Sequence, residues 1–188
     1  MKKLLFLSLA LILTTVSFSQ GDPEIKLYLR NGDIMTGTAK LSTINLVTDY
    51  GKLSIPLRSV STINIGITPM KSLEPKISNL IQQSLNSDEN MRKAAYEELG
   101  NLPIGAIPVL SDLVYSGKFE TGKYTDYTPE GALQDLMNKH SVPDGFSSKD
   151  VLTIDYMYTM GGIFEFAKIE LKTPHSSSPQ SISKDQIK

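Results

Sequence analysis

The chain has 188 residues, a formal net charge of −1 and no cysteine, so disulfide bonds and thiolate catalysis are excluded. The charge shows no basic surplus of the kind that proteins binding nucleic-acid backbones usually carry. The 40% share of hydrophobic residues is enough for one or two modest cores and argues against global disorder.

The N-terminus has the charged, apolar and small-residue order of a secretory signal peptide. Two lysines precede an apolar run from Leu4 to Val16, and Ser17-Phe18-Ser19 then places small residues at the positions that signal peptidase reads. The run is shorter than the ~20 residues that a transmembrane helix needs. We predict that residues 1–19 are removed by cleavage before Gln20, with an uncleaved anchor as the alternative. Loss of the two lysines would lower the formal charge from −1 to −3.

Residues 24–67 have the pattern of five short β-strands joined by tight turns. The apolar and polar alternation of Ile25–Arg30 is typical of a half-buried strand, and Asn31-Gly32 is a strong hairpin signal. Gly37 indicates a sharp bend in the next strand, and Pro56 must occupy an edge or an unpaired position. We predict a small five-stranded β-barrel of SH3-like or Sm-like type.

Residues 72–141 have apolar residues at spacings of three and four, which predicts an α-helical segment. One helix is expected to begin at Ser87 and to end at Gly100. Its expected apolar stripe is Met91, Ala94, Ala95 and Leu99.

Part of this segment, from Leu85 to Leu110, resembles a HEAT repeat. In that family an acidic turn precedes an Arg-x-Ala-Ala helix ending in Leu-Gly, and a second helix follows. The matching residues are Arg92, Ala94, Ala95, Leu99, Gly100, Ile107, Pro108 and Leu110. Helical repeats usually need about three units to bury a continuous core, and one clear unit is present. We expect this unit to pack against its neighbours.

A loop over residues 117–127 carries three aromatic side chains, Phe119, Tyr124 and Tyr127. Long loops in compact domains are often functional, and tyrosines are frequent anchors in protein interfaces. These three residues are therefore candidate partner-binding residues. The alternative is that their rings pack back over the helices.

Residues 150–188 predict a second, partial β module that repeats the first. At an offset of 125 residues, five identities fall in one ungapped frame: Met35 and Met160, Gly37 and Gly162, Ile44 and Ile169, Leu46 and Leu171, and Thr48 and Thr173. These identities predict an internal duplication, with convergence of bent hairpins as the alternative. The alignment reaches Lys188 before the counterparts of Ile63 and Ile65. We therefore expect an open sheet edge, filled by the first copy, a second subunit or a partner's peptide, unless the serine-rich end is a frayed tail.

The side chains suited to catalysis are few. His140 and His175 lack metal-ligand spacing, and the sequence has neither a glycine-rich phosphate loop nor a Gly-x-Ser-x-Gly elbow. Neighbouring carboxylates such as Glu97 and Glu98 lie on adjacent helical positions, which do not face each other. We predict a protein that is not an enzyme and that binds no metal and no cofactor.

The first β region also resembles the first motif of Sm-like RNA-binding proteins, through Leu29–Gly32, Gly37 and Ile44–Leu46. In that family the asparagine that matches Asn45 can contact a base, so the resemblance makes Asn45 a candidate binding residue. The second motif of the family should bring Arg-Gly, whereas this chain has Arg58-Ser59. Arg58 is therefore a candidate in an incomplete motif.

Over its whole length, Ile25–Ile65 resembles a module that recurs in uncharacterised exported bacterial proteins. The shared pattern is a strand, Asn/Asp-Gly, a glycine-containing strand, Ile/Leu-x-Leu-x-Thr, Tyr-Gly, a strand ending in Ile-Pro, and Val/Ile-x-x-Ile. The resemblance implies a location in the cell envelope or outside the cell, and a role in assembly or binding.

These patterns together predict an exported α+β protein, periplasmic or extracellular, that mediates protein–protein contact or self-association without a membrane span in the mature chain or a small-molecule ligand. An Sm-like nucleic-acid-binding module and a hydrolase of unrecognised type are the alternatives. An apolar groove or an open sheet edge would favour protein contact. A basic groove around Arg58 would favour nucleic acid, and a pocket joining a histidine to a buried carboxylate would favour hydrolysis.

Overall fold

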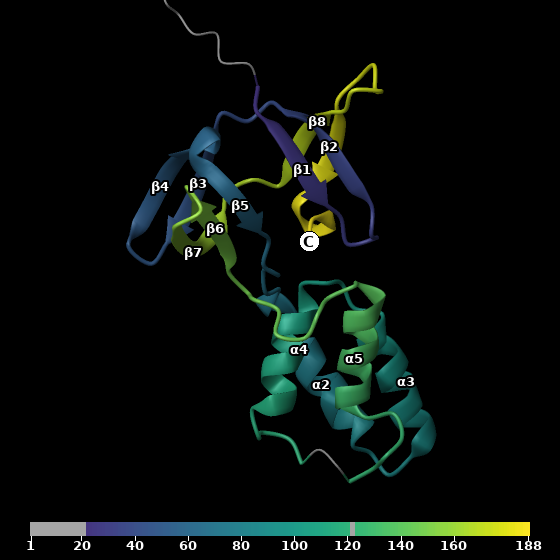
Figure 1. Ribbon diagram of the computed structural model, residues 1–188. Coiled ribbons are helices and arrows are strands. Elements are labelled where there is room, and N and C mark those ends of the chain that lie inside the picture. The colour runs from purple at the N-terminus through teal and green to yellow at the C-terminus, as the bar shows by residue number, and fades with distance from the viewer. Residues whose placement is uncertain (1–21, 121–122) are drawn as a thin grey trace, which may run out of the picture.

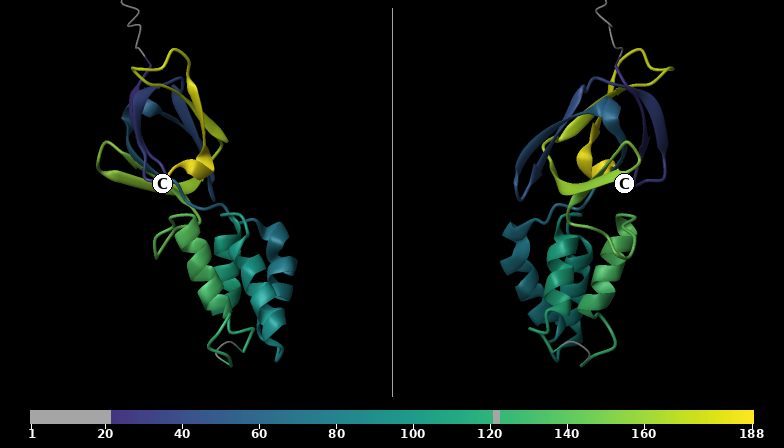
Figure 2. Two further views of the ribbon diagram at one scale, coloured as in Figure 1. Left: turned by 90° about the vertical axis from the view of Figure 1, so that its right-hand side faces the viewer. Right: turned by 60° about the vertical axis from the view of Figure 1, so that its left-hand side comes forward.

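The computed structural model describes residues 22–120 and 123–188, so the predicted signal peptide, residues 1–19, lies outside the described residues. The described chain is an α+β protein in which a β domain and a helical segment lie end to end, joined by two stretches of chain (Figure 1, Figure 2). Each part has its own hydrophobic core. Leu46, Leu152 and Leu171 are fully buried in the first core, and Ile77, Leu110 and Leu136 in the second.

The helical segment contains four α-helices within the described residues: α2 (Glu74–Ser84), α3 (Glu89–Gly100), α4 (Ala106–Tyr115) and α5 (Pro129–Lys139). The side chain of Asp88 caps the start of α3 by accepting a hydrogen bond from the Asn90 N–H, and Thr128 caps α5 in the same way. The sequence of α4 is apolar on most sides because this helix packs between α2 and α5.

The strands of the described residues form two antiparallel sheets, and neither sheet closes into a barrel. The first has the order β1 (Glu24–Tyr28), β2 (Ile34–Ala39), β8 (Lys168–Lys172) and β9 (Gln180–Ser183). The second has the order β4 (Gly51–Pro56), β3 (Thr43–Thr48), β7 (Tyr158–Phe164), β6 (Asp150–Ile154) and β5 (Val60–Asn64).

The predicted five-stranded SH3-like or Sm-like barrel is therefore wrong, and the second β region is not a separate module. Strand β2 pairs with β8, β3 pairs with β7, and β5 pairs with β6, so both sheets contain strands from both β regions. Alternation and turn residues identify strands and hairpins, but they do not specify which distant strand each hairpin joins. The helical segment separates the two β regions in sequence and returns the chain to the same sheets (Figure 1).

The pairs that join strands of the two β regions, β2 with β8 and β3 with β7, follow the offset of the sequence alignment. Ala39 of β2 pairs with Leu171 of β8, and Leu46 of β3 pairs with Phe164 of β7. Adding 125 to Ala39 gives Phe164, and subtracting 125 from Leu171 gives Leu46. The two contacts are thus equivalent, and this equivalence supports an internal duplication as a proposal.

Gly37 and Gly162 are aligned with each other in the two β regions. Gly37 lies where β2 approaches β8, and Gly162 lies where β7 approaches β3. A Cβ atom on Gly37 would lie 2.4 Å from the carbonyl oxygen of Lys172, and one on Gly162 would lie 2.4 Å from that of Val47. Real side chains do not tolerate such a distance to backbone, so both contacts require glycine.

Candidate functional site

Strands β1 and β5 are edge strands of the two sheets (Figure 1). The residues of both strands line a groove of 940 Å³. This volume falls in the range of ligand-binding pockets, roughly 300–1,000 Å³. Its charged lining residues are Glu24, Lys26, Arg58 and Lys188, so basic groups outnumber acidic ones. Most of the other lining side chains are aliphatic or aromatic: Ile25, Leu27, Leu41, Ile44, Leu57, Val60, Ile63, Ile65, Phe166, Ile169 and Ile187.

Strand alternation explains why the wall of the groove that β1 forms is apolar. In β1 the side chains of Ile25 and Leu27 are half-buried and buried, whereas those of Glu24, Lys26 and Tyr28 are exposed. One face of the strand therefore supplies apolar side chains to the groove, while the other face supplies polar and aromatic groups at the rim.

The outer edge of β1 is largely unpaired within the part of the chain that the structure describes. Its partner there is an isolated bridge between Leu29 and Ile187, in which the Lys188 N–H donates to the Tyr28 carbonyl at 2.8 Å. Backbone groups of alternate strand residues point to the same edge. The N–H and C=O groups of Lys26 therefore point outward as those of Tyr28 do, and such groups are a template for another strand.

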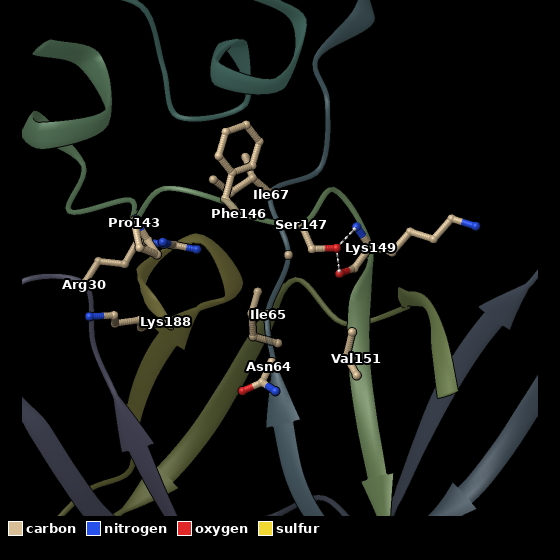
Figure 3. Close-up of a pocket in the computed structure, with 11 residues that line it drawn as sticks. Arg30, Asn64, Ile65, Ile67, Pro143, Phe146, Ser147, Lys149, Val151 and Lys188 are labelled. Carbon is tan, nitrogen blue, oxygen red and sulfur yellow. Dashed lines mark hydrogen bonds between the residues drawn. The ribbon is translucent and has the colours of Figure 1, made fainter. Parts of the chain in front are cut away.

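A smaller cavity of 160 Å³ adjoins the groove at the junction with the helical segment (Figure 3). The two spaces share the lining residues Asn64, Ile65 and Lys188. Figure 3 shows Arg30 and Lys188 on the same side of this cavity. Burial lowers the pKa of the Arg30 guanidinium, and the nearby Asp185 carboxylate opposes that shift. The junction thus extends the groove with a cationic rim.

A buried ion pair holds the second sheet in place beside the groove. Asp150 is 1% exposed, and its carboxylate accepts hydrogen bonds from the Gly66 N–H at 2.9 Å, the Phe164 N–H at 2.7 Å and the Lys184 Nζ at 2.6 Å. These bonds join β6, β7, the residue after Ile65 and the short 3-10 helix η3 (Lys184–Gln186). Asp150 is thereby fully engaged in a structural role.

The two candidates from the Sm-like resemblance lie in different surroundings. Arg58 is exposed on the short 3-10 helix η1 (Leu57–Ser59) and lines the groove. Asn45 is half-buried in β3, where it pairs with Ser54 of β4, and it lies outside the groove lining. Of the two residues, only Arg58 belongs to the groove.

The chain segments 117–120 and 123–127, which carry the aromatic candidates, lie at the end of the helical segment that points away from the β domain (Figure 1). Phe119 packs against the helical core. The Tyr124 ring lies 4.1 Å from the Arg92 guanidinium, and the Tyr127 ring meets Tyr96 edge-on at 5.8 Å between centroids. These contacts within the chain fit the packing alternative for the loop.

Two polar contacts behind this loop were not expected from the sequence. Arg92 is 6% exposed and donates to the carbonyl oxygens of Asn86 and Ser87 and to the Asp126 carboxylate. The bond to Asp126 raises the pKa of Arg92 and lowers that of Asp126. The Tyr96 hydroxyl donates to Asp135, which raises the pKa of Tyr96 to about 12.

The histidines lie apart from the groove. His140 Nε2 is 3.3 Å from the Leu102 carbonyl oxygen, and His175 is exposed. Over residues 22–120 and 123–188, neither histidine contacts the Asp150 carboxylate. In the same residues, no group of three His, Asp or Glu side chains could hold a metal ion. The described helices are all too short or too polar to cross a membrane.

A scan of protein-family models, a search of curated proteins and a search of solved structures each found no match to this chain.

Proposed function

We propose that this protein is exported to the cell envelope and mediates protein–protein contact, without enzymatic activity, by holding a polypeptide segment in the groove between β1 and β5. The observation that carries the proposal is the outer edge of β1, which is largely unpaired among the described residues and forms one wall of a mostly apolar groove. Export is supported by the order of charged, apolar and small residues in positions 1–19.

The chemistry of the groove suits a polypeptide in two respects. Aliphatic side chains such as Leu27, Ile44 and Ile63 offer contact to apolar side chains of a partner, and burial of apolar surface is the main source of affinity in protein contacts. The outward N–H and C=O groups of β1 offer hydrogen bonds to a partner backbone. A polypeptide segment supplies both kinds of group at once.

A nucleic acid fits this groove less well. The Sm-like alternative was based on Asn45 and Arg58, and of these two residues only Arg58 lines the groove. Arg58 and Lys26 line the groove, but most of the lining is aliphatic and would have no partner on a phosphate backbone.

Photo-crosslinking in cells tests the proposal. Benzoylphenylalanine placed at Tyr28, which is 50% exposed and lines the groove, is expected to form a covalent adduct with another polypeptide. The matched control is the same substitution at Tyr50, which is 101% exposed and lies in the β3–β4 turn outside the groove lining. Several-fold more adduct at Tyr28 is expected, and equal yields at both positions would contradict the proposal.

A second pair of variants distinguishes contact in the groove from nonspecific crosslinking elsewhere on the surface. Thr62→Trp places an indole in the groove and is expected to lower the adduct yield at Tyr28 several-fold. Thr43→Trp, at an exposed strand position outside the groove lining, is expected to leave the yield unchanged. An unchanged yield in the Thr62→Trp variant would show that contact occurs elsewhere.

A further inference from the structure

Strands β1 and β6 occupy equivalent positions in the two β regions, but the neighbouring strand on their outer edge differs. The β1–β2 hairpin corresponds to the β6–β7 hairpin at the offset of 125 residues. Strand β6 is covered by β5, through the pairs Thr62 with Thr153, Ile63 with Leu152 and Asn64 with Val151. The counterpart of β6 is β1, and within residues 22–120 and 123–188 the counterpart of this pairing is the single bridge between Leu29 and Ile187.

The bridge between Leu29 and Ile187 corresponds to the first residue pair between β5 and β6. The first pair between β5 and β6 is Val60 with Ile154. Ile154 lies 125 residues after Leu29, and Ile187 lies 127 residues after Val60, which is the offset beyond the longer β8–β9 turn. Leu29 and Ile187 are thus the equivalent of the first pair, and the positions that Thr62, Ile63 and Asn64 fill on β6 are open on β1.

We infer that the groove takes one extended polypeptide strand from another molecule, antiparallel to β1 and in the register that β5 adopts on β6. The inference rests on the proposed function and specifies its partner. The strand would place aliphatic side chains opposite Leu27 and Ile25, as Ile63 lies opposite Leu152 and Ile65 follows two residues later. Its alternate backbone groups would bond to the outward N–H and C=O of Lys26.

The rim of the groove specifies the charge of the strand. Lys26, Arg58 and Lys188 line the groove, and Glu24 is its one acidic lining residue. The outward side chains of the bound strand lie among these groups, so acidic or uncharged residues suit those positions and basic residues do not.

The shape of the groove favours a single strand over a second copy of this chain. The edge of another sheet carries a neighbouring strand about 4.8 Å away, and β5 occupies that side of the groove. A single extended segment has no such neighbour and fits between the two walls. The experiment must therefore distinguish self-association through β1 from binding of a single extended strand.

The probe is a fluorescent peptide with the sequence of residues 62–68, Thr-Ile-Asn-Ile-Gly-Ile-Thr, which starts after the position that Ile187 already fills. Its binding to the purified protein is followed by fluorescence anisotropy. A control peptide has serine in place of the first two isoleucines, and we expect it to bind about tenfold or more weakly. A second control peptide, Thr-Ile-Lys-Ile-Gly-Ile-Thr, introduces a basic outward side chain and should bind less well at low salt.

Lys26→Pro removes one of the outward N–H groups of β1, that of residue 26, at an exposed edge position where proline is tolerated. We expect this variant to lose peptide binding at least tenfold. Lys26→Ala is the matched control, because it removes the same side chain and keeps the N–H. The far-ultraviolet spectrum and melting temperature of both variants establish that they fold.

Nuclear magnetic resonance gives a test that needs no variant. Peptide binding should protect the amide protons of Lys26 and Tyr28 from exchange. A nitroxide on the N-terminus of the peptide should broaden the Tyr28 amide more than the Glu24 amide, and a nitroxide on the C-terminus should do the reverse. The opposite pattern would indicate a parallel strand and would overturn the inference.

The remaining outcomes are also decisive. Equal peptide binding by Lys26→Pro and Lys26→Ala would overturn strand pairing with β1. A dimer in sedimentation that Lys26→Pro abolishes would make the occupant a second copy and overturn the inference. If the peptides fail to bind but the Tyr28 adduct persists in cells, the proposed function stands and the strand geometry fails. Absence of the Tyr28 adduct in cells would contradict both the proposed function and the strand geometry.

Discussion

The guanidinium of Arg92 is the most deeply buried basic group of the helical segment that the structure describes. Its Nη atoms bond to two backbone carbonyls and to Asp126, and its central carbon lies 4.1 Å from the centroid of the Tyr124 ring. Its Nε atom has no hydrogen-bond partner in the described residues. Arg92 thus ties the start of α3 to the aromatic loop, and the loop is held by a charged side chain as well as by its rings.

We predict that Arg92→Ala lowers the free energy of unfolding by about 2–4 kcal/mol, because it removes three hydrogen bonds and a cation–π contact. Arg92→Lys keeps the charge but loses the fork that reaches both carbonyls and Asp126, so a loss of about 1–2 kcal/mol is expected. Urea unfolding measures both values. Lys93→Ala, at the exposed neighbouring position, is the control, and an equal loss in that variant would contradict this role.

The hydrogen bond of Tyr96 predicts how its contribution to stability changes with pH. Its pKa is raised to about 12 in the folded chain by the hydrogen bond to Asp135, compared with about 10 in the unfolded chain. The proton is therefore held more tightly in the folded state, so the contribution is full below pH 10 and is lost as pH rises towards 12. The stability difference between wild type and Tyr96→Phe should be constant from pH 7 to 9 and should shrink above pH 10 in urea titrations. A constant difference up to pH 11.5 would contradict this assignment.

Individual elements follow local sequence signals closely, but their faces and partners do not. The Asn31-Gly32 turn lies between β1 and β2 as expected, and α3 ends at Gly100 as expected. The stripe expected for α3 is only partly right, because Met91 is 43% exposed and Arg92 takes the inward position. A charged residue is rarely assigned to a core from its type alone, since burial of a charge requires partners that the local sequence does not reveal.

The close approach of β2 to β8 and of β7 to β3 predicts the effect of two glycine substitutions. Gly37→Ala and Gly162→Ala should each lower the free energy of unfolding by about 2–3 kcal/mol, because the added Cβ meets a backbone carbonyl that cannot move without disturbing the sheet. Gly100→Ala is the control, since a Cβ there meets nothing within 4 Å. This control should be neutral or stabilising by up to ~1 kcal/mol in a helix. Similar values for all three variants in urea unfolding would contradict the packing argument.

The Asp150 and Lys184 pair has an apolar counterpart, because the equivalent positions are Ile25 and Leu57. Asp150→Ala should cost about 3–5 kcal/mol, since it leaves Lys184 and two backbone N–H groups without their acceptor. The double variant Asp150→Ile with Lys184→Leu should be about 1–3 kcal/mol more stable than Asp150→Ala, because no buried charge remains. Thermal unfolding of the wild type, Asp150→Ala and the double variant measures the difference. A double variant less stable than Asp150→Ala would contradict the equivalence.

At the scale of the whole molecule, the α+β class and the order of strands and helices could be read from the sequence, and the groove could not. Its walls come from β1 and β5, which were assigned to one closed barrel and instead border different sheets. The Sm-like resemblance marks Arg58, which lies in the groove, whereas no sequence pattern marks Leu57 and Ile25 as groove residues. Aliphatic strand residues look alike in sequence whether they fill a core or line a groove.

The interleaved sheets also dictate the order in which the chain can fold. Pairing of β2 with β8 joins residues that are 134 apart in sequence, as in the contact of Thr38 with Lys172. Contacts over such separations form slowly, whereas the helices need only near neighbours. The helical segment should therefore gain hydrogen-exchange protection first in pulse-labelling experiments. The sheets would remain incomplete until the last strands, β8 and β9, have been synthesised.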